Sequence, residues 1–187
     1  MDKKTLTVEM IVEIPKGSKN KIEYDIKKKA FILDRPLYGA NFYPGEYGYI
    51  PNTLDYDGDP LDVISLITYP TFSGCLIEIR VLGAIEMIDA DEIDTKIFGV
   101  PKSDPRFNDY QTLKDIPQHL LDEITNFFLQ YKALQNKKVE IKGFLDLNRT
   151  VKEIEDCKML YTKYQEEMLT WDKKDLVTLL MKNKHKK

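Results

Sequence analysis

The feature that most constrains the fold is a repeated pattern of short apolar segments in residues 6–100. These segments are rich in β-branched residues, alternate in part with polar ones, and are separated by Gly and Pro. Many short strands at regular spacing, with turns between them, favour a closed or nearly closed β-barrel. The strands predicted in this way cover residues 6–14, 22–26, 30–33, 63–68, 76–82 and 84–88.

In the second half of the chain the apolar period changes from that of strands to that of helices. A segment that begins at Pro117 carries apolar residues at helical spacing, and Pro suits the first position of a helix. A last strand is predicted at 139–144, a second helix at 151–168 and a short helix within 171–187. We therefore expect a mainly-β α+β domain over residues 1–170, with a helical, basic tail over 171–187.

Composition and charge exclude several classes of protein. The 187 residues are 42% hydrophobic and 32% charged, which is an ordinary globular composition. No apolar stretch approaches the roughly 20 residues that span a bilayer, and no secretory signal opens the chain, so a cytoplasmic location is expected. The net charge is −3, and because residues 171–187 hold six Lys and two Asp, the rest is more acidic still. Such a body is unlike that of a nucleic-acid-binding protein.

The cysteines and histidines offer little for catalysis. Cys75 and Cys157 are far apart and form no CxxC motif, so two packed thiols are expected rather than a disulfide or a zinc site. His119 lies near the start of a predicted helix, and His185 lies in the Lys-rich tail. Nucleophilic catalysis that depends on histidine is therefore not expected.

Acidic residues gather first in residues 55–62, where four carboxylates fall within eight positions and Gly and Pro force a bend. At 4–5 Å each pair of like charges repels by about 3–4 kcal/mol at an effective dielectric near 20. Either solvent or bound cations must offset that repulsion, and oxygen ligands of this kind suit Mg²⁺, Ca²⁺ or Mn²⁺. An EF-hand fits poorly, because its glycine position is Pro60 and its bidentate glutamate position is Leu66.

A second acidic segment, residues 89–96, again holds four acids and also follows an apolar strand. Each segment alone is compatible with a solvated loop. Two such segments at strand ends in one small domain favour a shared metal site.

Cations and tyrosines that suit phosphate are interspersed among these acids and aromatics. The basic candidates are Lys21, Arg35, Lys96 and Lys132, and Tyr131 precedes the last of them on the apolar stripe of its predicted helix. Carboxylates, divalent cations and basic donors together indicate metal-assisted phosphoryl transfer. No glycine-rich P-loop is present in the sequence, which argues against a P-loop enzyme.

These residues resemble those of the family I inorganic pyrophosphatases. The run from Asp57 to Val63 matches the family signature D-x-D-P-x-D-V, and other matching pieces occur in the same order between about residues 8 and 145. The pieces are Val12–Pro15, Lys21–Glu23, Asp34–Arg35, Phe42–Pro44, Tyr47–Tyr49, Asp89, Asp94–Lys96, Phe127–Phe128 and Tyr131–Lys132.

The resemblance implies an OB-like closed β-barrel with two or more flanking helices, and hydrolysis of pyrophosphate to two phosphates with several Mg²⁺ ions, for which Mn²⁺ is a possible substitute. It also implies a homo-oligomer, a hexamer in relatives of this size. Asp59 matches the general base that acts on a water between two metals. The implied metal ligands are Asp57, Asp62, Asp89, Asp94 and Glu23, with Glu13 as an outer-shell partner. The implied phosphate-binding residues are Lys21, Arg35, Tyr47, Lys96, Tyr131 and Lys132, with Tyr43 nearby.

Three departures from the family pattern stand out. Glu46 occupies a position where a neutral residue is expected, Phe144 stands where Trp is frequent, and the segment after about Thr170 is longer than in minimal members. Two other readings remain at this stage. One is an OB-type nucleic-acid-binding module, which the acidic body disfavours. The other is a catalytically silent metal-binding protein, which would need none of the basic side chains Lys21, Arg35 and Lys132.

Overall fold

The computed structural model describes residues 6–89 and 92–184. Ala90, Asp91 and the basic end that includes His185 lie outside the described residues. The strands are β1 (Thr7–Ile14), β2 (Asn20–Asp25), β3 (Ala30–Pro36), β4 (Glu46–Tyr49), β5 (Asp62–Ser65), β6 (Leu76–Asp89), β7 (Glu92–Pro101) and β8 (Val139–Leu145). The α-helices are α1 (Gln118–Gln130), α2 (Leu147–Thr170) and α3 (Lys173–Lys184).

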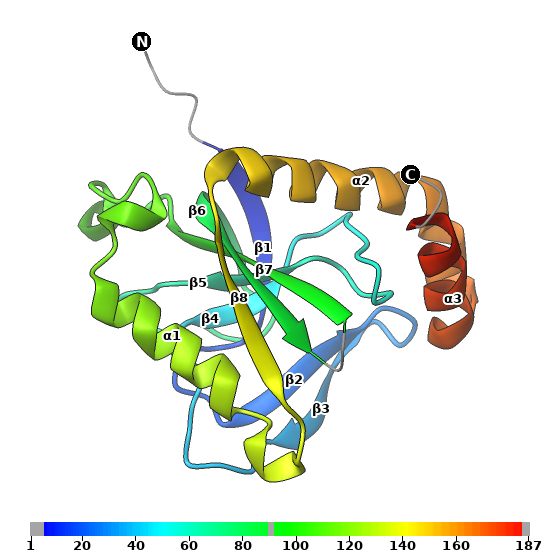
Figure 1. Ribbon diagram of the computed structural model, residues 1–187, viewed down its shortest axis with the longest axis horizontal. Coiled ribbons are helices and arrows are strands. Elements are labelled where there is room, and N and C mark those ends of the chain that lie inside the picture. Colours follow the sequence, from blue (N-terminus) through cyan, green and yellow to red (C-terminus); the bar gives the residue numbers. More distant parts are fainter. Residues whose placement is uncertain (1–5, 90–91, 185–187) are drawn as a thin grey trace.

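The main sheet closes on itself. Its strand order is β1-β4-β5-β7-β6-β8, and β1 also pairs with β6, so β1, β4, β5, β7 and β6 form a near-barrel ring within the described residues (Figure 1). β5 and β7 are parallel, whereas the other neighbours are antiparallel. A separate hairpin of β2 and β3 lies beside the ring. The expected mainly-β α+β fold with flanking helices is confirmed.

The long strand β6 makes the closure possible. Its first part pairs with β1, its last part pairs with β8, and β7 runs along it. A register shift between Val81 and Gly83 falls within this one strand, so the two segments predicted at 76–82 and 84–88 form one continuous strand. A bulge of this kind increases local twist and helps a sheet to curve.

One glycine sets how closely two strands of the ring approach. A Cβ added to Gly48 on β4 would lie 1.9 Å from the carbonyl oxygen of Ile11 on β1. Real side chains do not tolerate such a contact, so β1 and β4 can pair here only because the side chain is absent.

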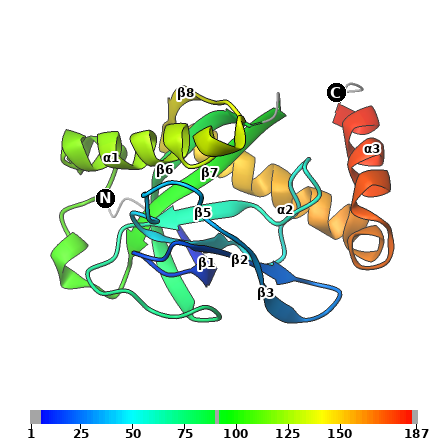
Figure 2. The same ribbon diagram turned by 90° about the horizontal axis from the view of Figure 1, so that it is seen from below.

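The helices cover different sides of the ring (Figures 1 and 2). The inner side of α1 joins one core through Ile124, Phe127 and Phe128, together with Ile14, Ile85 and Phe98 from strands. α2 joins a second core through Ile154 and Cys157, together with Val12, Val63 and Ile97. The ring is therefore fixed from two directions, while one end is left to polar side chains.

α3 follows α2 and lies at its far end, as Figures 1 and 2 show. It packs Leu176 and Leu180 into a third cluster with Leu54, Tyr164 and Met168. Among the described residues, no helix combines the length and apolar character that crossing a bilayer requires.

Candidate active site

The loop between β4 and β5 presents the first acidic segment, residues 55–62, which we call the acid loop. The backbone N–H of Asp55 donates to the carbonyl of Asp59 at 2.7 Å, and that of Gly58 donates to the carbonyl of Asp55 at 3.0 Å. Gly58 adopts a φ of +86°, which favours glycine. Fully buried Leu54 precedes the acids, and fully buried Leu61 lies between Asp59 and Asp62. The loop is thus held tightly while its carboxylates remain at one end of the ring.

The β6–β7 hairpin supplies the second group of acids. Asp89 ends β6, and Asp94 belongs to β7 itself, because the strand begins at Glu92 and not after the acidic segment. The parallel pairing of β5 with β7 places Asp62 close to Lys96. The Lys96 ammonium donates to Asp94 at 2.5 Å and also to Asp62.

Tyrosine and lysine side chains reach the same acids from β4 and α1. The hydroxyl of Tyr47 donates to Asp62 at 2.7 Å. At the end of α1, the hydroxyl of Tyr131 donates to Asp89 at 3.0 Å, and the Lys132 ammonium donates to the same oxygen.

The β2–β3 hairpin and β1 form another wall. The Lys21 ammonium donates to Glu23 and lies 3.5 Å from Asp34, which also pairs with Arg35. Glu13 on β1 accepts a 2.6 Å hydrogen bond from the N–H of Tyr24. Asp34 belongs to the family motif without an implied role of its own, and it links two of the predicted phosphate-binding cations, Lys21 and Arg35.

One cavity of about 840 Å³ collects these side chains. Arg35 does not line the cavity and lies beside it through its contact with Asp34. The other predicted site residues all line it, namely Glu13, Lys21, Glu23, Tyr43, Tyr47, Asp57, Asp59, Asp62, Asp89, Asp94, Lys96, Tyr131 and Lys132. The structure therefore brings together segments that extend from β1 to the end of α1.

The electrostatics differ among the acids of the cavity. Burial, and then the charges of Asp59, Asp55 and Asp62, raise the pKa of Asp57 well above its usual range. Burial likewise raises the pKa of Glu13 to about 8. In each case burial outweighs the groups that favour the ionised form, which for Glu13 are the N–H of Tyr24 and the charge of Lys21.

The pKa of Asp89 is shifted in the opposite direction, below its usual range. Burial alone would raise its pKa, but the hydrogen bonds from Lys132 and Tyr131 and the charge of Lys132 outweigh burial and lower it. Burial also lowers the pKa of Lys132, because the contact with Asp89 does not replace all the lost water. The ion pair between Asp89 and Lys132 therefore stabilises the fold less than the lowered pKa of Asp89 alone would indicate.

The residues fit divalent cations. Within the described residues, Oδ1 of Asp89 is buried without a hydrogen-bond partner, and the Asp57 carboxylate lies among other acids that oppose its ionisation. Unsatisfied, crowded carboxylate oxygens are the ligands that hard ions such as Mg²⁺ prefer.

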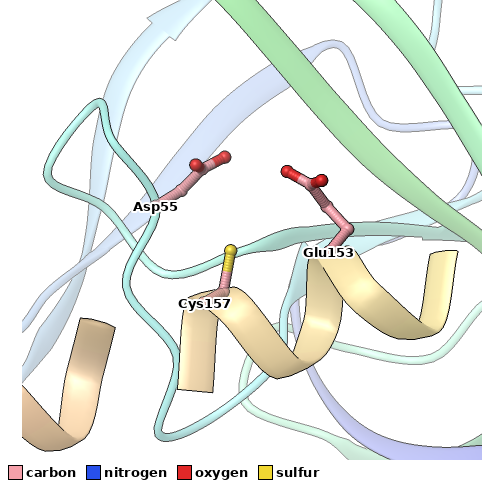
Figure 3. A group of neighbouring side chains, drawn as sticks. All are labelled: Asp55, Glu153 and Cys157. Carbon is pink, nitrogen blue, oxygen red and sulfur yellow. The ribbon is translucent and has the colours of Figure 1, made fainter. Parts of the chain in front are cut away.

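A further group lies behind the acid loop (Figure 3). Figure 3 shows Asp55 of the loop pointing toward Glu153 and Cys157 of α2, and one ligand atom from each lies within 4.8 Å of the others. Oδ1 of Asp55 accepts a 2.7 Å hydrogen bond from the N–H of Tyr56, and the N–H of Leu54 donates to the carbonyl of Cys157 at 3.0 Å. The hydrogen bond from Leu54 to Cys157 therefore ties the start of the acid loop to α2.

Two residues outside the predicted site, Glu46 and Lys173, differ in whether they line the cavity. Glu46 is fully buried and accepts a 2.8 Å hydrogen bond from the N–H of Thr71, and it is absent from the described residues that line the cavity. Lys173 of α3 does line the cavity and pairs with Asp59. Nothing in the local sequence distinguishes Lys173 from the other lysines of the tail.

A near-barrel ring with carboxylates, lysines and tyrosine hydroxyls at one end has the side chains of a hydrolase that uses divalent cations on a phosphate compound. The family model of inorganic pyrophosphatase matches residues 10–162. An inorganic pyrophosphatase of Halalkalibacterium halodurans is 51% identical over 80% of this chain and 92% of its own. One of Ureaplasma parvum is 42% identical over 97% of this chain and 98% of its own.

Solved structures agree with this result. The crystal structure of inorganic pyrophosphatase from Thermus thermophilus superposes with a TM-score of 0.82 at 43% identity, covering 87% of this chain and 95% of that one. The chain belongs to the inorganic pyrophosphatase family.

Proposed function

We propose that this protein hydrolyses inorganic pyrophosphate to two phosphates with the help of several Mg²⁺ ions. The observation that carries the proposal is that one cavity holds both the carboxylates for divalent cations and the lysines and tyrosines for phosphate oxygens. Names of relatives with 45–51% identity point to the same reaction.

The cations would be held by residues from three parts of the fold. Asp57, Asp62 and Asp94 would hold one ion, and Asp62 would also reach a second. Asp89 with Asp94 would hold an ion that arrives with substrate, Glu23 would contact another, and Glu13 would be an outer-shell partner. When bound, such ions acidify water and offset phosphate charge.

The chain's own part in the reaction begins with Asp59. A water oxygen attacks one phosphorus, Asp59 takes the proton that this water loses, and the bond from that phosphorus to the bridging oxygen breaks. The bridging oxygen leaves with the second phosphate. The Asp59 side chain is 54% exposed, so its carboxylate is open to a water molecule.

The phosphate oxygens would be bound by donors that keep their protons. Burial raises the pKa values of Tyr43, Tyr47 and Tyr131 above the usual tyrosine range, so their hydroxyls stay neutral donors at neutral pH. Asp62 and Asp94 raise the pKa of Lys96 despite its burial, which keeps this ammonium charged. With Lys21, Arg35 and Lys132, these groups would hold the substrate and stabilise the leaving phosphate.

The test is phosphate release from pyrophosphate at neutral pH, with Mg²⁺ and with chelator, beside ATP as a control substrate. We expect Mg²⁺-dependent release, which Mn²⁺ supports in part, and a loss of about 10²–10⁴-fold in Asp59→Asn. Asp109→Asn is the matched control, because Asp109 is exposed and outside the cavity. Near-full activity in D59N would contradict the role of Asp59, and no release by the wild type would contradict the function.

The same proposal includes a homohexamer, which follows from the family resemblance, and a cytoplasmic location. Analytical ultracentrifugation of the full chain measures the assembly directly. A monomeric mass at working concentration would contradict the hexamer without affecting the proposed reaction.

A further inference from the structure

α3 forms part of the cavity wall. Trp171, Lys173 and Leu176, at the start of α3 and just before it, line the cavity that holds the predicted site residues. This segment lies beyond residues 10–162, which the family model matches. The family's motif therefore assigns no role to the residues of this wall.

The wall is fixed in position by buried contacts. Leu176 is 2% exposed and Leu180 is fully buried, and both pack against Leu54, the residue before the acid loop. The Nδ2 of Asn183 donates to the hydroxyl of Tyr164 on α2 at 3.0 Å. α3 is thus anchored to α2 and to the base of the acid loop.

Contacts at the start of α3 set its position against the site itself. The Lys27 ammonium, from the turn between β2 and β3, donates to the carbonyl of Trp171. A Cβ added to Gly58 would lie 3.1 Å from Cγ2 of Val177 and 3.3 Å from Cγ of Lys173. The stem of Lys173 therefore packs on the turn that holds Asp57 and Asp59.

The ammonium group of Lys173, like those of the predicted phosphate-binding lysines, forms an ion pair with an acid of the cavity. Its ammonium pairs with Asp59, as Lys96 pairs with Asp62 and Asp94. The two remaining predicted phosphate-binding lysines likewise contact an acid of the cavity. Each of these ammonium groups is thus directed at carboxylates that bound cations would occupy.

We propose that Lys173 is a further substrate-binding residue, which contacts a phosphate oxygen on the Asp59 side of the cavity. This inference rests on the proposed function. Once Asp59 acts on water, its carboxylate is no longer free to hold the lysine, and a phosphate oxygen of the substrate would accept the hydrogen bond instead. The Lys173 side chain is 58% exposed, and exposed ion pairs contribute little stability, so leaving Asp59 costs little.

The test compares Lys173→Met with Lys174→Met and Lys173→Arg in the full-length protein. Methionine retains the stem that packs near Gly58 and removes only the charge, while Lys174 is an exposed neighbour on the same helix. Two quantities are measured with Mg²⁺ present. One is the Kd of methylenediphosphonate, a diphosphate that cannot be hydrolysed, by calorimetry; the other is the pair of constants KM and kcat for pyrophosphate.

We expect K173M to weaken methylenediphosphonate binding and to raise KM by about tenfold, the loss of one charge-assisted hydrogen bond. K173R should retain most of the affinity, and K174M should match the wild type. Equal Kd values in K173M and K174M would overturn the inference and leave Lys173 as a surface ion pair, even if K173M melts at a lower temperature.

The two proposals can fail separately. If the wild type binds methylenediphosphonate through Lys173 but releases no phosphate from pyrophosphate, the substrate-binding role stands and the reaction is wrong. If the wild type hydrolyses pyrophosphate and K173M binds and reacts as K174M does, the reaction stands and this inference is wrong.

Discussion

Asp57 and Asp89 lie in the same cavity but are held in opposite ways. Asp57, in the acid loop, is surrounded by other carboxylates, and its pKa is raised by burial and by their charges. Asp89, at the end of β6, receives hydrogen bonds from Tyr131 and Lys132 at the end of α1, and its pKa is lowered.

The difference follows from how the two segments are supported. The acid loop is closed by its own backbone hydrogen bonds and by α2, neither of which brings a cation to Asp57. The β6–β7 hairpin faces the end of α1, where Lys132 directly follows the buried Tyr131. Asp57 therefore lies among like charges, whereas Asp89 is paired with a cation of the chain.

Substituting the two aspartates separately should give the largest effect. Asp57→Asn should weaken Mg²⁺ binding and lower hydrolysis by about 100-fold or more, since the loss of even an outer-shell partner of a metal costs about 10–100-fold. In EDTA it should also stabilise the protein, increasingly as pH rises, because a carboxylate with a raised pKa costs stability above its usual titration range. Calorimetry with Mg²⁺ and urea unfolding in EDTA measure the two effects.

Asp89→Asn is the matched variant for this comparison. It should lower stability in EDTA at neutral pH, since the variant leaves the half-buried Lys132 ammonium without its carboxylate. Stability changes of the same sign in D57N and D89N would show that the two acids are not held differently.

Removing the cation from the second acid should give an intermediate effect. Lys132→Met should lower the free energy of unfolding at neutral pH by about 1–3 kcal/mol, the range for a charge-assisted hydrogen bond lost from a half-buried carboxylate. Because the pKa of Asp89 is lowered in the folded state, its contribution is present above the usual value of 3.8 and is lost as pH falls through the folded pKa.

Urea unfolding of K132M and wild type from about pH 7 to about pH 3 tests this expectation. The gap between the two proteins should close toward acid. A gap that persists unchanged at the acid end would mean that Lys132 stabilises through its packing rather than through Asp89.

Substitution of Glu46 should give the smallest effect and the most specific test, because Glu46 is a buried acid outside the cavity. Burial raises its pKa despite the hydrogen bond from Thr71, so its contribution to stability declines as pH rises above the usual range near 4.5. Glu46→Gln should therefore be more stable than wild type at about pH 8 but not at about pH 4. Thermal unfolding at both pH values measures the difference.

Mg²⁺ separates Glu46 from Asp57. Saturating Mg²⁺ should reverse the advantage of D57N over wild type but leave that of E46Q unchanged, since Glu46 does not line the cavity. A Mg²⁺-dependent change in E46Q would instead show that Glu46 affects metal binding.

Sequence reasoning located most of the elements and the family, because apolar periodicity and a dense motif are local properties. It placed the residues from 89 to 96 in a solvated or metal-binding segment, whereas β7 begins at Glu92 and makes Asp94 a strand residue. Charged residues obscured the strand signal there, since one side of β7 faces the cavity. The bulge at Gly83 was equally ambiguous, because a glycine between two apolar runs fits a turn as well as a bulge.

For the predicted site residues, the sequence indicated the chemistry of the side chains but not their individual electrostatic states. All but Arg35 line one cavity, and their residue types alone indicated carboxylates for cations and donors for phosphate. Their separate electrostatic states could not be read from spacing, since Asp57 and Asp89 are each one of four acids in a short segment.

The amino-acid sequence by itself determined most of the strands, the helices, the family and the chemistry of the acid loop, because each depends on neighbouring residues. Only the tertiary structure decided which cation meets which acid. Lys132 and Asp89 are 43 positions apart, and Lys173 and Asp59 are 114 apart. Such pairs depend on closure of the ring and on the docking of α1 and α3, which are set by the packing of whole elements. The sequence around each lysine therefore does not indicate which acid it will contact.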